Sequence, residues 1–504
     1  YIHDPDGVDT EEKLNYILEM RAKDPMHCAP YAERFGCEFV PNAKCWGVKD
    51  VDIYMPAATQ NDVNLDWAKK IAESGVKYYI EVANMPTTNE ALEFLKSQKH
   101  MVVAPSKAVN AGGSTDRWEN ASGEVVLLND IDLTELTEWT PIGQGKATGS
   151  PSYNTLTNPF TGVFDGQGFT IKGIRWTFNV ENETTHLHGL FGAIKDATIK
   201  NLKLGAAGDQ ITLAGTSQNV VSAGALAGYA EGSTIVNVTN NVSVILTGDN
   251  PDATLMMLAG IAGCIKSTTI GGETKDDAVI NNGDVKTGRI TNTANGGTGM
   301  NIGGICAFTL GAGTKLNYCT NNGEISAPTG RGGGLVGTLG GSTTEENGTV
   351  IANSTNNGTI QDDAIGQYGG SKDYYNYKRM GGLVGGTVTN NNLRIEYCTN
   401  NGNVFSQLGC RTGGFVGHNQ ATIVGCVNKG TILANITYAS GEPQHGPGWA
   451  CGYSGKKLVT QCAKGGRVGE WDTYKDNPGS APEATNDNAL CYKNGDYFDP
   501  SQNY

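Results

Sequence analysis

Short apolar runs separated by glycine and asparagine turns fill the chain from about residue 125 to residue 470. A clear copy has GGLVG at 381–385, an apolar run at 393–397 and CTNNGNV at 398–404. Related copies lie at 304–325, 334–360 and 414–432. Apolar residues at alternate positions predict short β-strands, and recurrence of the whole pattern predicts a stack of similar units.

The glycine that closes the turn recurs at intervals of 40, 35, 44, 28 and 36 residues, at Gly283, Gly323, Gly358, Gly402, Gly430 and Gly466. Uneven intervals predict loops of different length on a constant frame. We expect Asn and Gly at these corners to adopt positive φ. One unit cannot bury its apolar side alone, so the units must stack. This predicts a right-handed parallel β-helix, or β-solenoid; the alternative, a propeller, needs steadier antiparallel blades.

Residues 1–113 follow a different pattern. Apolar runs at 51–55, 78–82 and 101–103 predict three short strands, and helical spacing predicts a helix between each pair. Thr87 and Glu90 resemble a capping box for the second helix. Alternating strands and helices predict a parallel sheet, so the fold class is a partial α/β, Rossmann-like segment followed by the β-solenoid.

Composition supports this division. Glycine makes up 70 of 504 residues and proline only 17, which suits tight turns in stacked strands. The formal net charge of −14 argues against nucleic-acid binding. No apolar run reaches the length of a membrane span.

Twelve cysteines are too few for a disulfide scaffold of this size. Four of them, Cys319, Cys398, Cys426 and Cys462, lie four residues before turn glycines. We predict a buried column of small side chains. Metal binding is the alternative, but no His or carboxylate lies at ligand spacing, so no metal residue is assigned.

Three motifs of the first segment, PAATQN at 56–61, EVANMPTT at 81–88 and APSKAVNAGG at 104–113, resemble the cofactor domain of NADP-dependent hexameric glutamate dehydrogenases. Residues 3–9 (HDPDGVD) and 45–47 (CWG) fit the same family. The resemblance implies that Ala58, Thr59 and Asn84 line the nicotinamide side of an NADP site. It places Asn110 near the nicotinamide ribose and the substrate.

The sequence also departs from that family. Ala57 stands where the family usually has Cys, and the pattern breaks at Ser114. The family's Gly-x-Gly-x-x-Gly turn and its catalytic Lys and Asp would lie upstream of Tyr1, so no catalytic residue is assigned. Lys107 and Asp52 are only loose candidates for proton transfer. We expect no turnover of glutamate by this chain.

From about 108 to 470 the chain resembles bacterial surface proteins with GLUG-type repeats. The resemblance rests on the runs at 125–133, 139–143 and 160–171 and on the first plain copy, GLFG at 189–192. It implies a secreted or cell-surface binding or adhesion scaffold. Residues 108–113 fit both families, which suggests that two unrelated genes are joined there.

Function in the repeats is expected on loops that leave the frame. The largest, 367–379, offers flat rings and donors suited to a glycan or a protein partner, through Tyr368, Tyr374, Tyr375, Tyr377 and Arg379. The same Tyr side chains could instead pack over the stack. No nucleic-acid partner is expected.

The sequence therefore predicts a partial cofactor segment at 1–113, β-solenoid repeats at 114–470 and a cap or tail at 471–504. A surface binding scaffold fused to an incomplete dehydrogenase is the first function. An oxidoreductase acting on CH–NH2 groups and a polysaccharide-active β-helix protein are the alternatives. The two parts imply opposite compartments, cytoplasm and cell exterior; the exterior is favoured for most of the chain.

Overall fold

A computed structural model describes the chain except for residues 24–27, 49–50, 58, 84, 105–123, 147–154, 182–186, 216–219, 248–254, 288–299, 329, 342–347, 363–377, 389–391, 408–410, 436, 440–441, 455–458, 485–490, 494–495 and 499–504. The chain divides into two compact units, Tyr1–Glu119 and Asn120–Tyr504. The predicted domain boundary at 113/114 lies outside the described residues and stays a prediction.

The first unit contains four helices and five strands within its described residues. In chain order they are β1 Ile2–His3, α1 Glu11–Lys23, α2 Ala29–Phe35, β2 Glu38–Phe39, β3 Ile53–Tyr54, α3 Leu65–Glu73, β4 Tyr78–Ile80, α4 Asn89–Lys96 and β5 Val102–Ala104. Strands β3, β4 and β5 form a parallel sheet in that order, with a helix in each connection. The predicted strand–helix–strand–helix–strand order is therefore confirmed.

Helices α3 and α4 bury one face each against this sheet, through a core of Ala68, Ile71, Tyr79, Ala91 and Leu95.

Each of these two helices begins at a capping side chain. Asn64 Oδ1 accepts from the Trp67 N–H at 3.1 Å, and Thr88 Oγ1 accepts from the Ala91 N–H at 3.4 Å. The prediction that Thr87 caps α4 is wrong by one residue. The Thr87 hydroxyl is buried and lies 2.6 Å from the Tyr79 hydroxyl.

The second unit is almost entirely β-sheet. Its nine-stranded sheet consists of β12 Arg175–Asn179, β15 Gln210–Ala214, β19 Ser243–Thr247, β24 Val285–Thr287, β29 Ile325–Ser326, β34 Ile360–Gln361, β39 Val404–Ser406, β44 Ile432–Ala434 and β51 Val468–Gly469. Its eight-stranded sheet consists of β13 Leu187–His188, β16 Val220–Gly224, β20 Leu255–Ala259, β25 Met300–Gly303, β30 Arg331–Gly333, β35 Arg379–Gly381, β40 Arg411–Gly413 and β47 Pro447–Gly448.

A 27-stranded sheet completes the frame. It consists of β6 Glu124–Val126, β7 Ile131–Asp132, β10 Phe160–Asp165, β11 Thr170–Lys172, β14 Phe191–Leu204, β17 Ala227–Glu231, β18 Thr234–Asn240, β21 Ala262–Lys266, β22 Thr269–Ile270, β23 Val279–Asn281, β26 Cys306–Leu310, β27 Lys315–Asn317, β28 Cys319–Asn321, β31 Val336–Leu339, β32 Thr349–Ala352, β33 Thr355–Asn356, β36 Val384–Thr387, β37 Leu393–Glu396, β38 Thr399–Asn400, β41 Val416–Asn419, β42 Thr422–Val424, β43 Val427–Asn428, β48 Cys451–Ser454, β49 Val459–Thr460, β50 Ala463–Lys464, β52 Cys491–Lys493 and β53 Asp496–Phe498.

Outside these sheets, β8 Gln144–Lys146 pairs with β9 Thr155–Asn158, and β45 Thr437–Ala439 pairs with β46 Glu442–His445. Helix α6, Trp471–Tyr474, follows the last repeat.

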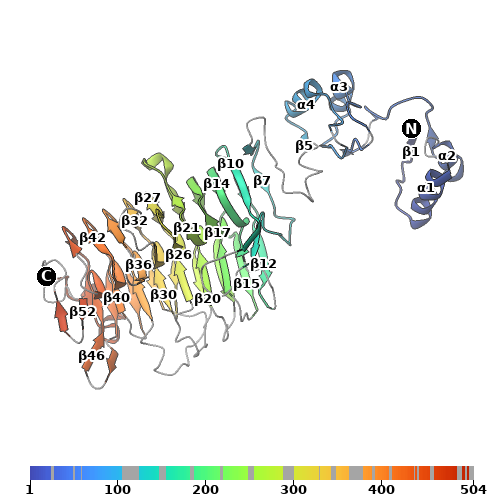
Figure 1. Cartoon of the computed structure of the whole chain (residues 1–504). Helices are drawn as coiled ribbons and strands as arrows, with labels where there is room; N and C mark the ends of the chain where they lie inside the picture. The colour runs from blue at the N-terminus through green and yellow to red at the C-terminus, as the bar shows by residue number, and fades with distance from the viewer. Residues whose placement is uncertain are drawn as a thin grey trace. The chain divides into compact units, whose positions relative to one another are not determined.

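The chain visits the three sheets in a fixed order. It runs from β16 through β17 and β18 to β19, then returns to β20, which pairs with β16 in parallel. Successive strands lie side by side in each sheet from β10 to β50 (Figure 1). The prediction of mostly parallel β-sheet is therefore confirmed. A right-handed, closed β-solenoid is a finer statement and stays a prediction.

Connections of variable length leave this frame at two kinds of place. One runs from the nine-stranded to the eight-stranded sheet, as between β19 and β20 or between β34 and β35. The other lies within the 27-stranded sheet, where residues 232–233 join β17 to β18 but residues 340–348 join β31 to β32. The passages from the eight-stranded to the 27-stranded sheet are short, as between β16 and β17.

Six buried asparagines form a ladder through the turns that lead into the nine-stranded sheet. Each Nδ2 donates to the carbonyl two residues ahead in its own turn. In the first five asparagines it also donates to the Oδ1 of the next asparagine, at 2.8–2.9 Å. The ladder consists of Asn240, Asn281, Asn321, Asn356, Asn400 and Asn428, all fully buried. Every rung satisfies polar groups that would otherwise be costly to bury.

The backbone conformation of the turn glycines differs from the prediction. Gly283, Gly323, Gly358, Gly402 and Gly430 do not have positive φ; of the predicted set only Gly466 does, at 67°. A Cβ at Gly358 would lie well inside contact distance of the Gly323 carbonyl oxygen, and the same holds at the other four. The prediction of positive φ is wrong there, because close stacking of backbones is what requires glycine.

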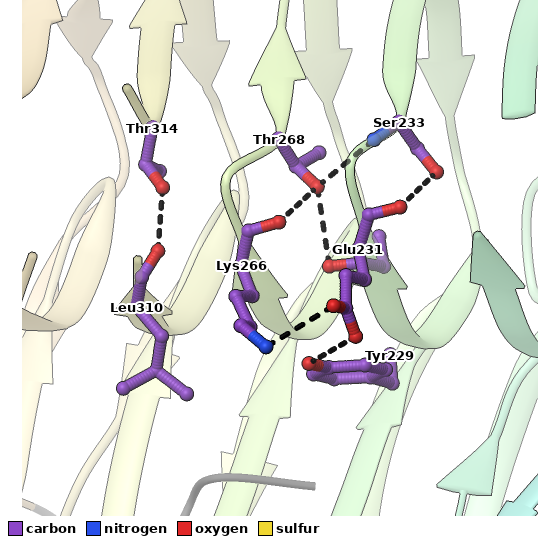
Figure 2. A network of polar contacts seen from close by, with 8 residues as sticks. Tyr229, Glu231, Ser233, Lys266, Thr268, Leu310 and Thr314 are labelled. Carbon is purple, nitrogen blue, oxygen red and sulfur yellow. Dashed lines mark hydrogen bonds and ion pairs between the residues drawn. The ribbon is translucent and has the colours of Figure 1, made fainter. Parts of the chain in front are cut away.

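Hydroxyl side chains likewise pair buried backbone groups at the bends between β17 and β18 and between β21 and β22 of the 27-stranded sheet (Figure 2). Thr268 Oγ1 donates to carbonyls of Lys266 and Ala230 and accepts from the Ser233 N–H at 3.3 Å. Glu231 is held by Lys266 Nζ at 3.1 Å and by the Tyr229 hydroxyl at 3.2 Å. These contacts join neighbouring repeats with side-chain bonds in addition to the backbone ladder.

The cysteines stack as neighbours in one register. Strand pairing places Cys319, Ser354, Cys398, Cys426 and Cys462 at equivalent positions of successive repeats. Each side chain donates to the carbonyl two residues before it, at 2.6–3.7 Å. Burial raises the pKa of the Cys319 thiol to about 12, so this thiol stays protonated and unreactive.

Candidate functional site

The first unit brings two loops together at the carboxyl ends of its parallel strands. The Pro56 carbonyl, just after β3, accepts from the Val82 and Ala83 N–H groups, just after β4, at 3.1 and 2.9 Å. The Asn61 N–H donates to the Met85 carbonyl at 2.9 Å. Ligands of open α/β sheets bind at this edge, so these loops are the candidate cofactor site.

Thr59 lies at that edge. It follows β3 within the loop that meets Val82 and Ala83, and its side chain is exposed. The hydroxyl can donate to and accept from a bound molecule. Ala58, Asn84 and Asn110 lie outside the described residues, so only Thr59 of the four predicted cofactor residues is placed.

A buried hydrogen bond to β4 anchors the loop that follows this strand. Tyr79 is fully buried in β4 and its hydroxyl meets the buried Thr87 hydroxyl at 2.6 Å. Burial holds the pKa of Tyr79 well above its usual value, so this phenol is a neutral hydrogen-bonding group. It fixes the loop that carries position 84 and does not transfer protons.

Of the two loose proton-transfer candidates, only Asp52 lies within the described residues. Asp52 is an exposed carboxylate paired with Lys77 Nζ at 3.0 Å. Lys107 lies outside the described residues.

In the second unit, Arg379 is the first residue of β35. Strand pairing puts it directly between Arg331 of β30 and Arg411 of β40. We call Arg331, Arg379 and Arg411 the arginine column. Tyr368, Tyr374, Tyr375 and Tyr377 lie outside the described residues, so the predicted tyrosine loop stays a prediction.

Sequence reasoning found Arg379 but missed its two neighbours. Each arginine stands two residues before the first glycine of a Gly-Gly pair that ends its strand, at 333–334, 381–382 and 413–414. That shared place in the repeat was the available signal. Aligning the copies on the Gly-Gly pair, and not on the asparagine turn, would have found it.

Burial affects the charges of this column. It lowers the pKa of Arg331 to about 10. Burial, together with the neighbouring charges of Arg331 and Arg411, lowers the pKa of Arg379 to about 9. The guanidinium groups of Arg331 and Arg379 therefore remain cationic at neutral pH, although neighbouring charges of the column repel that of Arg379.

The described residues contain no group of three or more His, Cys, Asp or Glu side chains placed to hold a metal ion. In the same part of the chain, no helix is long and apolar enough to cross a membrane.

Comparison with known proteins identifies the first unit. Residues 1–116 match the Glutamate/Leucine/Phenylalanine/Valine dehydrogenase family. This dehydrogenase match confirms the family predicted for the N-terminal part. GLUG-type repeats are not shown and stay a prediction.

Two curated relatives illustrate the match. The NAD-specific glutamate dehydrogenase of Clostridium symbiosum is 66% identical over 167 residues, which is 32% of this chain and 37% of that protein. The NADP-specific glutamate dehydrogenase of Psychrobacter sp. (strain TAD1) is 40% identical over 112 residues, 22% of this chain and 24% of that protein. The chain thus spans about a third or less of these relatives, whose cofactor specificity is mixed.

Two solved structures match parts of the chain. A glutamate dehydrogenase structure is 66% identical, with a TM-score of 0.21, over 22% of this chain and 25% of that chain. An IgA1 protease structure covers 68% of this chain and 20% of that chain at 12% identity and a TM-score of 0.28.

Proposed function

We propose that residues 1–116 form the nicotinamide-facing part of a cofactor site in an oxidoreductase that acts on CH–NH2 groups. The dehydrogenase family match over this stretch carries the proposal. The parallel sheet of β3, β4 and β5 supports it, because the loops that follow β3 and β4 meet at the carboxyl edge and leave Thr59 exposed there.

NADP is the cofactor that the sequence motifs favour, whereas relatives use NAD or NADP. Titration of the full chain with NADPH and with NADH, followed by cofactor fluorescence, tests both. We expect Thr59→Val to weaken binding severalfold because a polar contact is lost. The control Glu93→Gln changes an exposed side chain of α4 and should leave binding unchanged.

If neither cofactor changes its fluorescence on addition of the chain, the cofactor site is wrong. A separate sample of the chain with glutamate and oxidised NAD or NADP tests the sequence-based expectation of no turnover. Formation of NADH or NADPH there would contradict that expectation.

For the second unit we propose a β-solenoid scaffold that binds a ligand and acts outside the cell or at its surface. The repeated passage through three parallel sheets favours this fold. The connections of variable length, such as those between the nine-stranded and eight-stranded sheets, provide a surface that can change without disturbing the core.

A glycan array probed with the full chain tests the scaffold proposal, and product analysis on polysaccharides tests the alternative of a polysaccharide-active protein. Binding without cleavage supports the scaffold. Released oligosaccharides support the enzyme. Absence of both binding and cleavage would contradict the two ideas together.

A further inference from the structure

The arginine column is built as one surface. Neighbouring strands lie about 4.8 Å apart, so the paired positions of Arg331, Arg379 and Arg411 repeat at that interval along the stack. Asn301 of β25 continues the same register. Three guanidinium groups in a row are thus fixed by backbone pairing and not by flexible loops.

The side-chain stems of Arg331 and Arg379 lie beside Gly386 of β36. A Cβ at Gly386 of β36 would lie 3.0 Å from Arg379 Cδ and 3.4 Å from Arg331 Cδ. The absence of a side chain at Gly386 therefore makes room for both stems. Arg331 Nη1 donates to Thr338 Oγ1 at 3.1 Å, and the Thr338 hydroxyl in turn contacts Asn301 Oδ1.

The third arginine has an aromatic neighbour. The Arg411 guanidinium lies 4.5 Å from the ring centre of Tyr453, and the His418 ring meets the same ring edge-on at 4.8 Å. Rings placed beside guanidinium groups suit a ligand that has both charged groups and flat or apolar faces.

The charges of Arg331 and Arg379 are not balanced by the described residues around them. Neither Arg331 nor Arg379 forms an ion pair with any carboxylate in the described part of the chain, whereas Arg394 of β37 pairs with Glu396. Nε of Arg331 and Nε of Arg379 are buried and have no hydrogen-bond partner there. Buried cations without an anion are costly, and a site for an anionic ligand accounts for them.

We propose that the arginine column binds an acidic polysaccharide through its carboxylate or sulfate groups. The guanidinium fork matches both groups with paired hydrogen bonds. A ligand that repeats its charge along a chain fits three donors spaced along the stack. This proposal rests on the proposed scaffold function and names its ligand class.

An acidic peptide fits the column less well. Peptides that bind to sheets usually pair with an open strand edge. Strands β30 and β35 each have a paired strand on both sides, so they offer no free edge. Guanidinium forks are what this surface presents, and these suit the carboxylate or sulfate groups of sugar acids.

The test measures binding of the full chain to polygalacturonate and to chondroitin sulfate by calorimetry at two salt concentrations. Neutral dextran and polyglutamate are the comparison polymers. We expect one or both acidic polysaccharides to bind, more weakly at high salt, and dextran not to bind. Arg379→Gln should weaken binding about tenfold or more, as expected for loss of a charged hydrogen-bonding group.

Two further variants distinguish the effect of the planar guanidinium group from the effect of positive charge alone. Arg379→Lys keeps the charge but loses the planar fork, so binding should still weaken severalfold. Arg394→Gln removes an equal charge from an exposed, carboxylate-paired arginine of the same repeat and should leave binding unchanged. Circular dichroism and melting temperature should show Arg379→Gln folded and no less stable, because it removes a desolvated charge.

Three results would overturn the proposal. One is no binding of either acidic polysaccharide, and another is equal binding by the Arg379→Gln variant. The third is equally tight binding of polyglutamate, which would assign the column to an acidic peptide. If the chain binds only neutral glycans, unaffected by Arg379→Gln, the scaffold function stands and the arginine site fails.

Discussion

The asparagine ladder gives a sharp test of what holds the repeats together. Asn321 Nδ2 donates to the Gly323 carbonyl and to Asn356 Oδ1, both at 2.9 Å, and Asn321 Oδ1 accepts from Asn281 Nδ2 at 2.8 Å. The side chain is fully buried. Asn321→Ala therefore removes three hydrogen bonds, so the Gly323 carbonyl and Asn356 Oδ1 lose this donor and Asn281 Nδ2 loses this acceptor.

Each buried polar group that loses its partner costs about 1–3 kcal/mol, so three such groups predict a loss of about 6 kcal/mol in the free energy of unfolding. The next residue provides a matched control. Asn322 is exposed; its Nδ2 donates to Asn282 Oδ1 at 2.7 Å, and its Oδ1 accepts from Asn357 Nδ2 at 2.8 Å. Water can replace these bonds, so Asn322→Ala should cost about 0.5 kcal/mol or less.

Urea unfolding of both variants, followed by far-ultraviolet circular dichroism, measures the difference. Because each repeat contacts only its neighbours, the loss should be local. Hydrogen exchange should therefore rise first in β28 and β33, on either side of the missing rung. Equal unfolding free energies for the two variants would refute the view that the inner ladder stabilises the stack.

Three other substitutions test the frame. Gly358→Ala should lower the unfolding free energy by about 3 kcal/mol through overpacking, because its Cβ would meet the Gly323 carbonyl. The control Gly313→Ala, at φ 69° with open space around it, should cost only about 1 kcal/mol. Reversal of this order in urea unfolding would contradict the argument. Lys378→Met removes the cation that pairs with the buried Asp362 carboxylate, which Ser406 and Gln407 also bind, and should lower the unfolding free energy by about 3–5 kcal/mol. The double variant Lys378→Met, Asp362→Leu should recover much of this loss. No recovery would show that the charge pairing is not the cause. Tyr397 has φ 52°, and Asn353 and Gly425, at the equivalent positions of the neighbouring repeats, also have positive φ. Tyr397→Asn should therefore change calorimetric stability by less than about 0.5 kcal/mol, whereas the β-branched Tyr397→Val should cost about 1–2 kcal/mol. Equal melting temperatures for the two variants would show that backbone strain at this position is not limiting.

Sequence pattern predicted the strands of the repeats because inward positions must be apolar in every copy, as at Leu383 and Val384. It also predicted the order of strands and helices in the first unit. It misjudged the turn glycines, because positive φ and close approach of a neighbouring backbone both select glycine. Only coordinates separate these causes, as Gly358 and Gly466 show.

The candidate sites were less predictable for a related reason. Thr59 was found through a motif, which carries information from a family and not from physics. Arg331 and Arg411 were missed because they are 48 and 32 residues from Arg379 and differ in local context. Contact between them depends on strand register, which loops of different length obscure in a linear sequence.

The same register explains how one frame can hold both a stable core and a variable surface. In the eight-stranded sheet the inward column keeps Ala223, Leu258 and Ile302 in the main core. The neighbouring column changes from Met257 to Asn301 and then to the three arginines. Inward positions are restricted by packing against both neighbouring repeats, whereas the alternate positions face away from that core. A chemical function can therefore be assembled there from several repeats, one residue from each, at little cost to the fold.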